Sequence, residues 1–214
     1  MKIANYIDHT ILAATATSTE VEKLCKEAIE YNFFSVCINP YYINVAKELL
    51  KGSSVKVCTV VGFPLGQNTI ESKVSETIDA IKKGADEIDM VINIAALKES
   101  KLDYLQDEIG KVVKAANGNT VKVIIETCLL TDKEKELACE VIMKAKAHFV
   151  KTSTGFSNSG ADLEDIKLFK KVVGDNIKIK ASGGIRSYKD ALDFINAGAN
   201  RLGTSSGIKI VSEF

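Results

Sequence analysis

The chain alternates between short apolar runs and amphipathic helical stretches from one end to the other. We expect strands at residues 6–8, 33–38, 55–61, 87–92, 121–126, 148–151, 177–180 and 200–203. Their nearly unbroken apolar character is typical of parallel strands that are covered on both faces. Helix-start signals lie between them. Thr17, Thr131 and Ser187 each stand three residues before an acidic residue, and Asn68 is placed to cap the helix that begins at Thr69.

Apolar residues within the helical stretches recur at three- and four-residue spacings, which predicts helix stripes that face a core. These residues are Ile78, Ile81, Leu102, Leu105, Ile109, Val112, Ile166 and Phe169. The chain has two prolines and no low-complexity tract, so no linker divides it. We therefore expect one domain that spans residues 1–214.

A weak internal repeat sets the register of the strands. Each copy is a helix end with Gly or Lys at its C-cap, then an alanine and a strand; the copies are residues 81–89, 143–151 and 195–203. Counting four residues from that alanine reaches Asp89, Lys151 and Gly203, and the same count from Phe33 reaches Cys37. Eight β/α units predict an α/β fold, a closed (β/α)8 (TIM) barrel with right-handed crossovers. Alternate strands of such barrels share side-chain layers, so we expect these four residues to form the uppermost layer, where barrel active sites lie.

Lys151 ends an apolar strand and is followed at once by a Thr-Ser-Thr-Gly turn. Burying an ammonium group is costly, and desolvation favours the neutral amine that can attack a carbonyl carbon. The alternative is a strand-end lysine whose ammonium reaches solvent. Lys180 closes the next strand, so the two lysines would meet at the barrel mouth, where Asp89 could exchange protons with a bound intermediate. A purely structural Lys–Asp–Lys ion network is the other interpretation.

Two glycine-containing loops follow the seventh and eighth strands, at residues 180–186 and 203–207. Gly183 and Gly184 let the backbone approach an anion, and Arg186 can add a charge-assisted contact. A single Gly-Gly pair is more often a simple turn. Loops at these two places form the usual phosphate site of (β/α)8 barrels, so the pair predicts a phosphorylated ligand.

Composition excludes several classes of function. Lys+Arg and Asp+Glu number 28 each, which argues against a nucleic-acid-binding surface. No apolar run approaches the roughly 20 residues that span a bilayer or resembles a signal peptide, and five cysteines without a C-x-x-C pair suggest reduced thiols in the cytoplasm. The chain has only two histidines, so a three-histidine zinc site is not available. Two roles stay open: Cys37 lines the site or packs in the core, and Glu126, ending the fifth strand, orients neighbours or satisfies loop amides.

Three segments closely resemble the deoxyribose-phosphate aldolase family, in its short bacterial-type form: residues 151–156, 180–186 and 85–93. Residues 6–10, 57–66, 122–127 and 203–207 support the resemblance, which extends over nearly the whole chain. It implies a class I aldolase that cleaves 2-deoxy-D-ribose 5-phosphate into acetaldehyde and D-glyceraldehyde 3-phosphate. Lys151 matches the Schiff-base lysine, Asp89 the proton donor and acceptor, and Lys180 the second lysine. No metal or organic cofactor is implied.

The resemblance also assigns ligand contacts and assembly. The residues that it places around the phosphate are Gly155, Gly183, Gly184, Arg186, Gly203, Ser205 and Ser206. Thr10 and Cys37 match neighbours of the sugar, and a homodimer is implied. The chain departs from the family where Ala13-Ala14 replaces Lys-Pro, and where Lys146 and His148 replace Gly and Asp before the sixth strand. Two rival functions stay open: another Schiff-base aldolase or transaldolase, and a catalytically silent barrel that binds a sugar phosphate.

Overall fold

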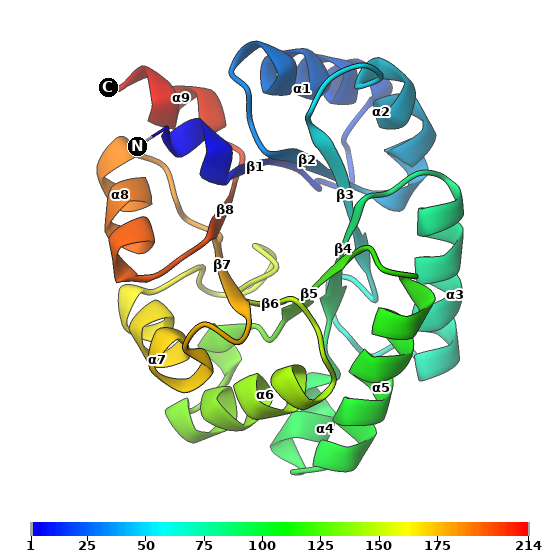
Figure 1. Ribbon diagram of the computed structural model, residues 1–214, viewed down its shortest axis with the longest axis vertical. Coiled ribbons are helices and arrows are strands. Elements are labelled where there is room, and N and C mark those ends of the chain that lie inside the picture. The colour runs from blue at the N-terminus through cyan, green and yellow to red at the C-terminus, as the bar shows by residue number, and fades with distance from the viewer. Residues whose placement is uncertain (1, 214) are drawn as a thin grey trace.

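Eight parallel strands close into a barrel within residues 2–213, which a computed structural model of the chain describes (Figure 1). The strands are β1 (Ile7–Ile11), β2 (Ser35–Ile38), β3 (Lys56–Val61), β4 (Glu87–Val91), β5 (Thr120–Ile124), β6 (Phe149–Lys151), β7 (Lys178–Ser182) and β8 (Arg201–Thr204). They pair in sequence order, and β8 pairs with β1. The predicted (β/α)8 barrel is confirmed. The predicted domain limits include residues 1 and 214, which lie outside the described residues.

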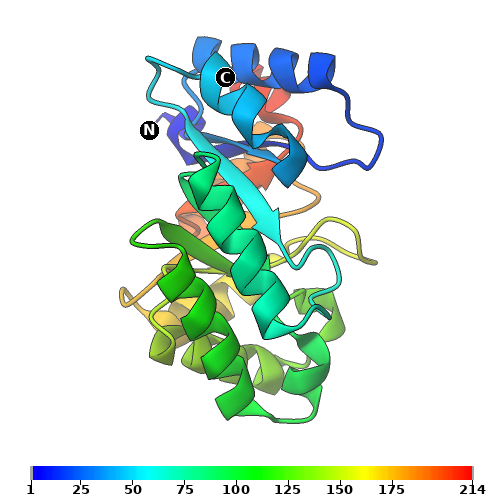
Figure 2. The same ribbon diagram turned by 90° about the vertical axis from the view of Figure 1, so that its right-hand side faces the viewer.

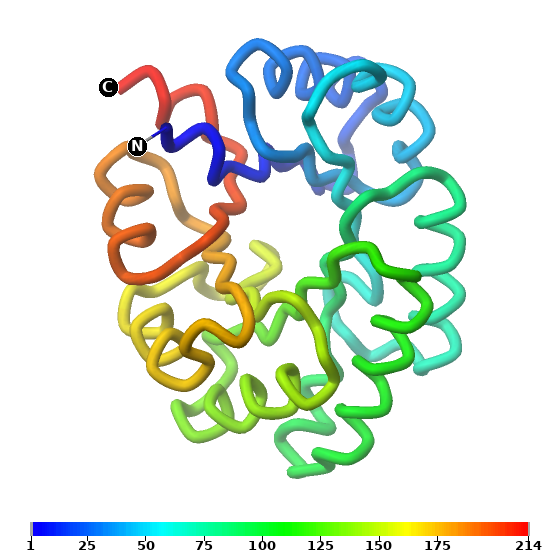
Figure 3. Tube along the Cα trace, in the orientation of Figure 1, coloured from blue at the N-terminus to red at the C-terminus, as the bar shows by residue number. Residues whose placement is uncertain are grey.

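Helices surround the barrel and cover the outer face of its strands (Figures 1 and 2). They are η1 (Ile3–Tyr6), α1 (Ser18–Glu30), η2 (Pro40–Tyr42), α2 (Ile43–Leu49), α3 (Ile70–Lys82), α4 (Ile94–Lys98), α5 (Leu102–Ala115), η3 (Thr127–Leu129), α6 (Asp132–Lys144), α7 (Leu163–Val173), α8 (Tyr188–Ala197) and α9 (Gly207–Ser212). The first and last of them, η1 and α9, lie side by side (Figure 3). None of the described helices is long and apolar enough to cross a membrane.

The helix caps follow the sequence signals with one exception. Thr17, Thr131 and Ser187 each form a complete capping box at the start of α1, α6 and α8. The prediction that Asn68 caps α3 is wrong. The hydroxyl of Thr69 accepts the N–H of Ser72 and caps that helix, while the amide of Asn68 donates to a glutamate on α3.

The predicted core stripe is confirmed on α5 and α7, but on α3 it is wrong for one of its two residues, because Ile81 packs against the core and Ile78 does not. Ile78 is 53% exposed. The inward face of α3 carries Lys73 and Thr77 instead, and both are fully buried. Hydrophobic spacing therefore misplaces the buried face of α3 by about one residue, because two of its buried positions are polar.

The internal repeat has a physical basis at the entry to three strands. One side chain in each copy accepts a backbone N–H of the preceding strand, at 2.9–3.0 Å. The acceptors are Asp86, His148 and Asn200, and the donors are Val57, Val121 and Ile179. His148 accepts through Nδ1 and so provides the hydrogen bond that Asp86 provides at β4. This departure from the family pattern therefore preserves the contact.

The second departure leaves a strained backbone. Lys146 has a φ of 60°, in the left-handed region, whereas the equivalent positions are Gly84 at 104° and Gly198 at 120°. A side chain with a Cβ atom costs about 1–2 kcal/mol in this conformation. We expect Lys146→Gly to raise the free energy of unfolding by about 0.5–1 kcal/mol in urea titrations. Lys144→Gly, in the last turn of α6, is the control and should lower it; a loss in both variants would contradict the strain.

Strand register brings the expected residues to one level. Cys37 pairs with Cys58, and Cys58 with Glu87, two residues before Asp89. The same two-residue step recurs between even-numbered strands, because strands tilt in a closed barrel, and it places Cys37, Asp89, Lys151 and Gly203 together. We expected this level to be the uppermost one, and that prediction is wrong. By the same register Thr10 and Ser182 lie above it, and Asp8, Cys58, Lys122 and Lys180 lie below it.

Candidate active site

Asp89 is the centre of a buried cluster of lysines inside the barrel. Lys151 Nζ and Lys180 Nζ each lie 2.7 Å from Asp89 Oδ2, and Lys122 Nζ lies 2.8 Å from Oδ1. Asp89, Lys122 and Lys180 are fully buried, and Lys151 is 3% exposed. The structure thus brings together the three residues that the sequence singled out, and it adds Lys122.

A second set of charges lies beneath this cluster. Asp8 Oδ2 is 2.5 Å from Lys180 Nζ, and Glu87 Oε2 is 2.6 Å from Lys122 Nζ. Arg201 forms ion pairs with both of these carboxylates. The cluster therefore holds four cationic side chains and three carboxylates. Among the described residues, Lys151 has one carboxylate partner, whereas each of the other three cations has at least two.

The ion pairs fix the charge states of Asp89 and Lys180. Burial alone would raise the pKa of Asp89, but the ammonium groups of Lys122, Lys151 and Lys180 hold it well below its usual range. Burial alone would lower the pKa of Lys180, but Asp8 and Asp89 raise it well above its ordinary value. At neutral pH, Asp89 is therefore a carboxylate and Lys180 an ammonium.

A cavity of about 410 Å³ opens above the cluster at the carboxyl ends of the strands. Lys151 lines it, together with the predicted ligand contacts Thr10, Gly155, Gly183, Gly184, Arg186, Gly203, Ser205 and Ser206. Cys37 is not among the lining residues; it is fully buried and packs with Leu12, Cys58 and Val60. Asp89 and Lys180 lie below the cavity floor, so the expectation that Lys180 sits at the barrel mouth is wrong. Strand β7 continues to Ser182, two residues beyond the predicted end.

Glycine is required at two places in this wall. Gly183 has a φ of 86°, and a Cβ atom there would lie 2.9 Å from the Cα of Gly160. A Cβ atom on Gly203 would lie 2.8 Å from Ser182 Cβ and 3.1 Å from Lys180 Cε. Gly203 therefore leaves room for the stem of Lys180 inside the barrel.

The sequence reasoning missed four residues of the cluster: Asp8, Glu87, Lys122 and Arg201. A signal was present, because each is a charged residue within or beside an apolar strand. Glu87 and Asp89, for example, flank Ile88 and therefore share the inward face of β4. Glu126 was misplaced as well. Strand β5 ends at Ile124, and Glu126 lies in the following turn, where its carboxylate accepts the backbone N–H of Thr154.

One set of metal-ligating side chains is close-packed among the described residues. Single ligand atoms of Cys37, Cys58 and Asp89 lie within 4.8 Å of one another. The three ammonium groups around Asp89 already neutralise its carboxylate, and they would repel a divalent cation. This donor set fits an ion-pair network better than a metal centre.

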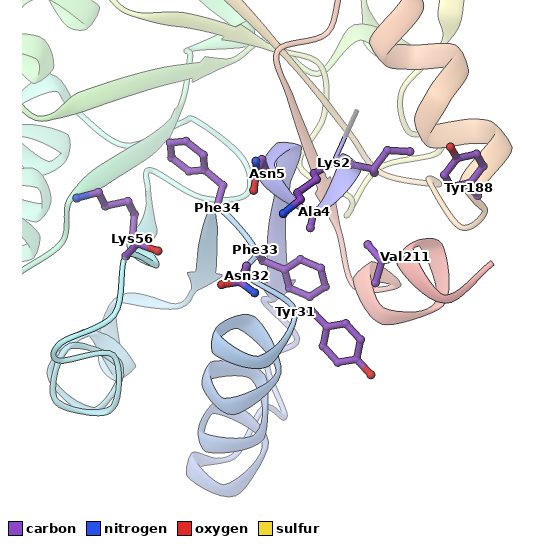
Figure 4. Close-up of a pocket in the computed structure, with 12 residues that line it drawn as sticks. Lys2, Ala4, Asn5, Tyr31, Asn32, Phe33, Phe34, Lys56, Tyr188 and Val211 are labelled. Atoms are coloured by element: carbon purple, nitrogen blue, oxygen red, sulfur yellow. The ribbon is translucent and has the colours of Figure 1, made fainter. Parts of the chain in front are cut away.

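A larger cavity, of about 880 Å³, lies at the opposite end of the barrel, beside η1 (Figure 4). Tyr31, Phe34, Lys56 and Tyr188 are among its lining residues. No member of the buried ion cluster lines it. The active sites of (β/α)8 barrels lie at the carboxyl ends of the strands, so the smaller cavity above Lys151 is the candidate active site.

Comparison with known proteins identifies the family. The model of the DeoC/LacD family of aldolases matches residues 2–213. The chain belongs to this family. The deoxyribose-phosphate aldolase of Malacoplasma penetrans is 61% identical over 210 residues, which cover 98% of this chain and 95% of that protein. The deoxyribose-phosphate aldolase of Caldanaerobacter subterraneus is 59% identical and covers 100% of this chain and 94% of its own.

A solved structure agrees with the family assignment. The deoxyribose phosphate aldolase of Aeropyrum pernix superposes with a TM-score of 0.92 at 36% identity, over 99% of this chain and 90% of that one. The resemblance drawn from the sequence is therefore confirmed.

Proposed function

We propose that this protein is a class I aldolase that reversibly cleaves 2-deoxy-D-ribose 5-phosphate into acetaldehyde and D-glyceraldehyde 3-phosphate. The observation that carries the proposal is the position of Lys151, at the floor of a glycine-walled cavity and 2.7 Å from Asp89. The relatives from Malacoplasma penetrans and Caldanaerobacter subterraneus, both deoxyribose-phosphate aldolases, support the choice of substrate.

Charge balance favours Lys151 as the nucleophile. Four cations share three carboxylates, so full ionisation of the cluster leaves one positive charge in excess. Lys180 and Lys122 are fully buried and each pairs with at least two carboxylates, whereas Lys151 pairs with Asp89 alone among the described residues and borders the cavity. Release of a proton from Lys151 removes the excess charge and produces the neutral amine that attacks a carbonyl.

The reaction follows from this neutral amine. Lys151 adds to the C1 aldehyde of the open-chain sugar, and loss of water gives a protonated imine. When the C3 hydroxyl loses its proton, its oxygen becomes the carbonyl of the departing aldehyde, the C2–C3 bond breaks and the electrons of that bond move into the imine. D-glyceraldehyde 3-phosphate leaves, and the acetaldehyde enamine takes up a proton and is hydrolysed from Lys151. Asp89, in contact with both Lys151 and Lys180, is placed to pass these protons.

The far end of the cavity suits the phosphate group. Gly183 and Gly184 both have positive φ, and they line the wall together with Arg186, Ser205 and Ser206. Backbone N–H groups and a guanidinium are the donors that bind phosphate in proteins. Binding energy at this end serves to orient the C2–C3 bond over Lys151.

A coupled assay for D-glyceraldehyde 3-phosphate release tests the proposal. We expect turnover of 2-deoxyribose 5-phosphate that a chelator leaves unchanged. Faster turnover of fructose 6-phosphate would identify a transaldolase-type enzyme instead. Absence of turnover on both sugars would favour the rival function, a catalytically silent barrel that binds a sugar phosphate. Loss of activity on addition of the chelator would contradict the metal-free mechanism.

Lys180 adds a prediction about pH. Lys180→Met removes one of the three ammonium groups that hold the pKa of Asp89 well below its usual range, so Asp89 would become protonated at a higher pH than in the wild type. We expect the rise of the pH–rate profile to move to alkaline pH and kcat/KM at neutral pH to fall about tenfold. Lys178→Met, an exposed position on the same strand, is the control. An unshifted pH–rate profile would mean that Lys180 does not tune the site and serves only as a structural partner of Asp8.

Location and assembly complete the proposal. All five cysteines are unpaired and four of them are buried, which supports a reducing cytoplasm as the site of action. We also propose a homodimer, although the relative from Aeropyrum pernix is described as a tetramer. Light scattering coupled to size-exclusion chromatography would distinguish the two assemblies.

A further inference from the structure

Glu126 has a backbone conformation that its residue type disfavours. Its φ is 54° and its ψ 69°, in the left-handed region, and the residue is only 3% exposed. A buried, non-glycine residue holds such a conformation when its surroundings fix it, and these residues cluster at functional sites. The end of β5 does not by itself account for this conformation, so the contacts of the Glu126 side chain must hold it.

The carboxylate of Glu126 fixes the turn that follows Lys151. It accepts the backbone N–H of Thr154 at 3.2 Å and also accepts the hydroxyl of Thr154. The hydroxyl oxygen of Thr154 in turn accepts the backbone N–H of Phe156 at 3.0 Å. One side chain thus sets the position of three consecutive residues, and Gly155 is the middle one.

The other side of this turn is held by β7. Ser182 Oγ donates to the carbonyl of Ser153 at 2.6 Å, and the hydroxyl of Thr152 donates to the carbonyl of Ser182 at 3.1 Å. A Cβ atom on Gly183 would lie 3.8 Å from the Cα of Gly155, so the two glycines adjoin in the cavity wall. The turn is therefore clamped from β7 on one side and by Glu126 on the other.

A carboxylate is an unexpected side chain in this place. Burial raises the pKa of Glu126, and the hydrogen bonds from Thr154 oppose that rise. A buried acid beside a site for an anion would repel the ligand unless its charge were satisfied. Both carboxylate oxygens of Glu126 accept hydrogen bonds from the backbone N–H or the hydroxyl of Thr154. These bonds stabilise the buried charge and hold the turn in place.

We propose that Glu126 is a positioning residue that aligns Gly155 and Phe156 for binding of the substrate phosphate. This inference rests on the proposed function. Glu126 acts through Thr154, and it contacts neither the imine nor the reacting bond. Its loss should therefore weaken binding of a phosphorylated sugar and leave the chemistry at Lys151 intact.

Glu126→Gln tests the inference, because the amide keeps a single acceptor oxygen for the two donors of Thr154. We expect KM for 2-deoxyribose 5-phosphate to rise roughly tenfold, with kcat changed by less than about threefold. The KM for unphosphorylated 2-deoxyribose should stay at the wild-type value. Glu164→Gln, on the exposed start of α7, is the matched control and should change neither constant.

Two further measurements separate the possible failures. Borohydride trapping of acetaldehyde on Lys151 should proceed at the wild-type rate in Glu126→Gln, and a loss of trapping would assign Glu126 to the chemistry. Thr154→Val removes the same hydroxyl contact and keeps Glu126 in place. It should raise KM for 2-deoxyribose 5-phosphate, and this test is still available if Glu126→Gln misfolds. An unchanged KM in a folded variant overturns the positioning role, whereas an inactive wild-type protein overturns the proposed function itself.

Discussion

Replacement of Lys151 by arginine is expected to reduce kcat by at least about 10⁴-fold and to leave the fold intact. A guanidinium stays charged at every accessible pH and cannot form the imine. It can nevertheless pair with Asp89, so the buried carboxylate keeps a cationic partner and the melting temperature should change little. Steady-state turnover of 2-deoxyribose 5-phosphate is the measurement, and Lys56→Arg, on the exposed start of β3, is the control.

Chemical trapping identifies the reacting nitrogen directly. Borohydride added with acetaldehyde should leave an ethyl group on Lys151 alone, as peptide mass spectrometry would show. Lys122 and Lys180 lie in the same cluster but are fully buried and paired below the cavity floor. An ethyl group on either of them, or turnover that survives in Lys151→Arg, would contradict the assignment.

Lys151 could be found from the sequence because it breaks a pattern. A lysine at the end of an apolar strand, before a Thr-Ser-Thr-Gly turn, is anomalous on hydrophobic grounds. The repeat then supplied the register, because the alanine of each copy lies four residues before an inward-facing position. Asp89 and Gly203 followed from the same count, and the strand pairing places them level with Lys151.

The lower half of the cluster could not be found in the same way. Asp8 and Lys122 lie one strand apart from the residues that the repeat identified, and their meeting with Asp89 depends on the tilt of the closed barrel. Lys180 was placed at the mouth because β7 was expected to end there. The strand continues for two residues, and this difference puts Lys180 one level lower and seals it from solvent.

Polar residues in the core explain the remaining errors. The apolar spacing on α3 includes Ile78, but the helix turns Lys73 inward instead. A lysine is a poor candidate for a buried helix face until its partner is known. That partner, Glu108, lies 35 residues away on α5, so no local pattern could have indicated it.

Lys73 and Glu108 form an ion pair that no solvent reaches. Both side chains are fully buried between α3 and α5, which lie against the barrel on the side shown in Figure 2, and Lys73 Nζ is 2.7 Å from Glu108 Oε1. Lys73 Nζ also donates to the carbonyls of Gly66 and Val91 at 2.8 Å each. Glu108 Oε2 accepts the backbone N–H of Asn93 at 3.0 Å. The pair therefore connects the loop after β3 with the end of β4.

Lys73→Met is expected to lower the free energy of unfolding by about 3–5 kcal/mol, because it leaves Glu108 buried without its counter-charge and removes the donor to two carbonyls. Urea titration measures the change. The double variant Lys73→Met/Glu108→Leu should recover the part of the loss that comes from the unpaired charge of Glu108, while the carbonyls of Gly66 and Val91 stay without their donor. Lys83→Met breaks an exposed pair with Asp79 and should cost less than about 0.5 kcal/mol. A single variant as stable as this control would mean that the pair carries no net stability.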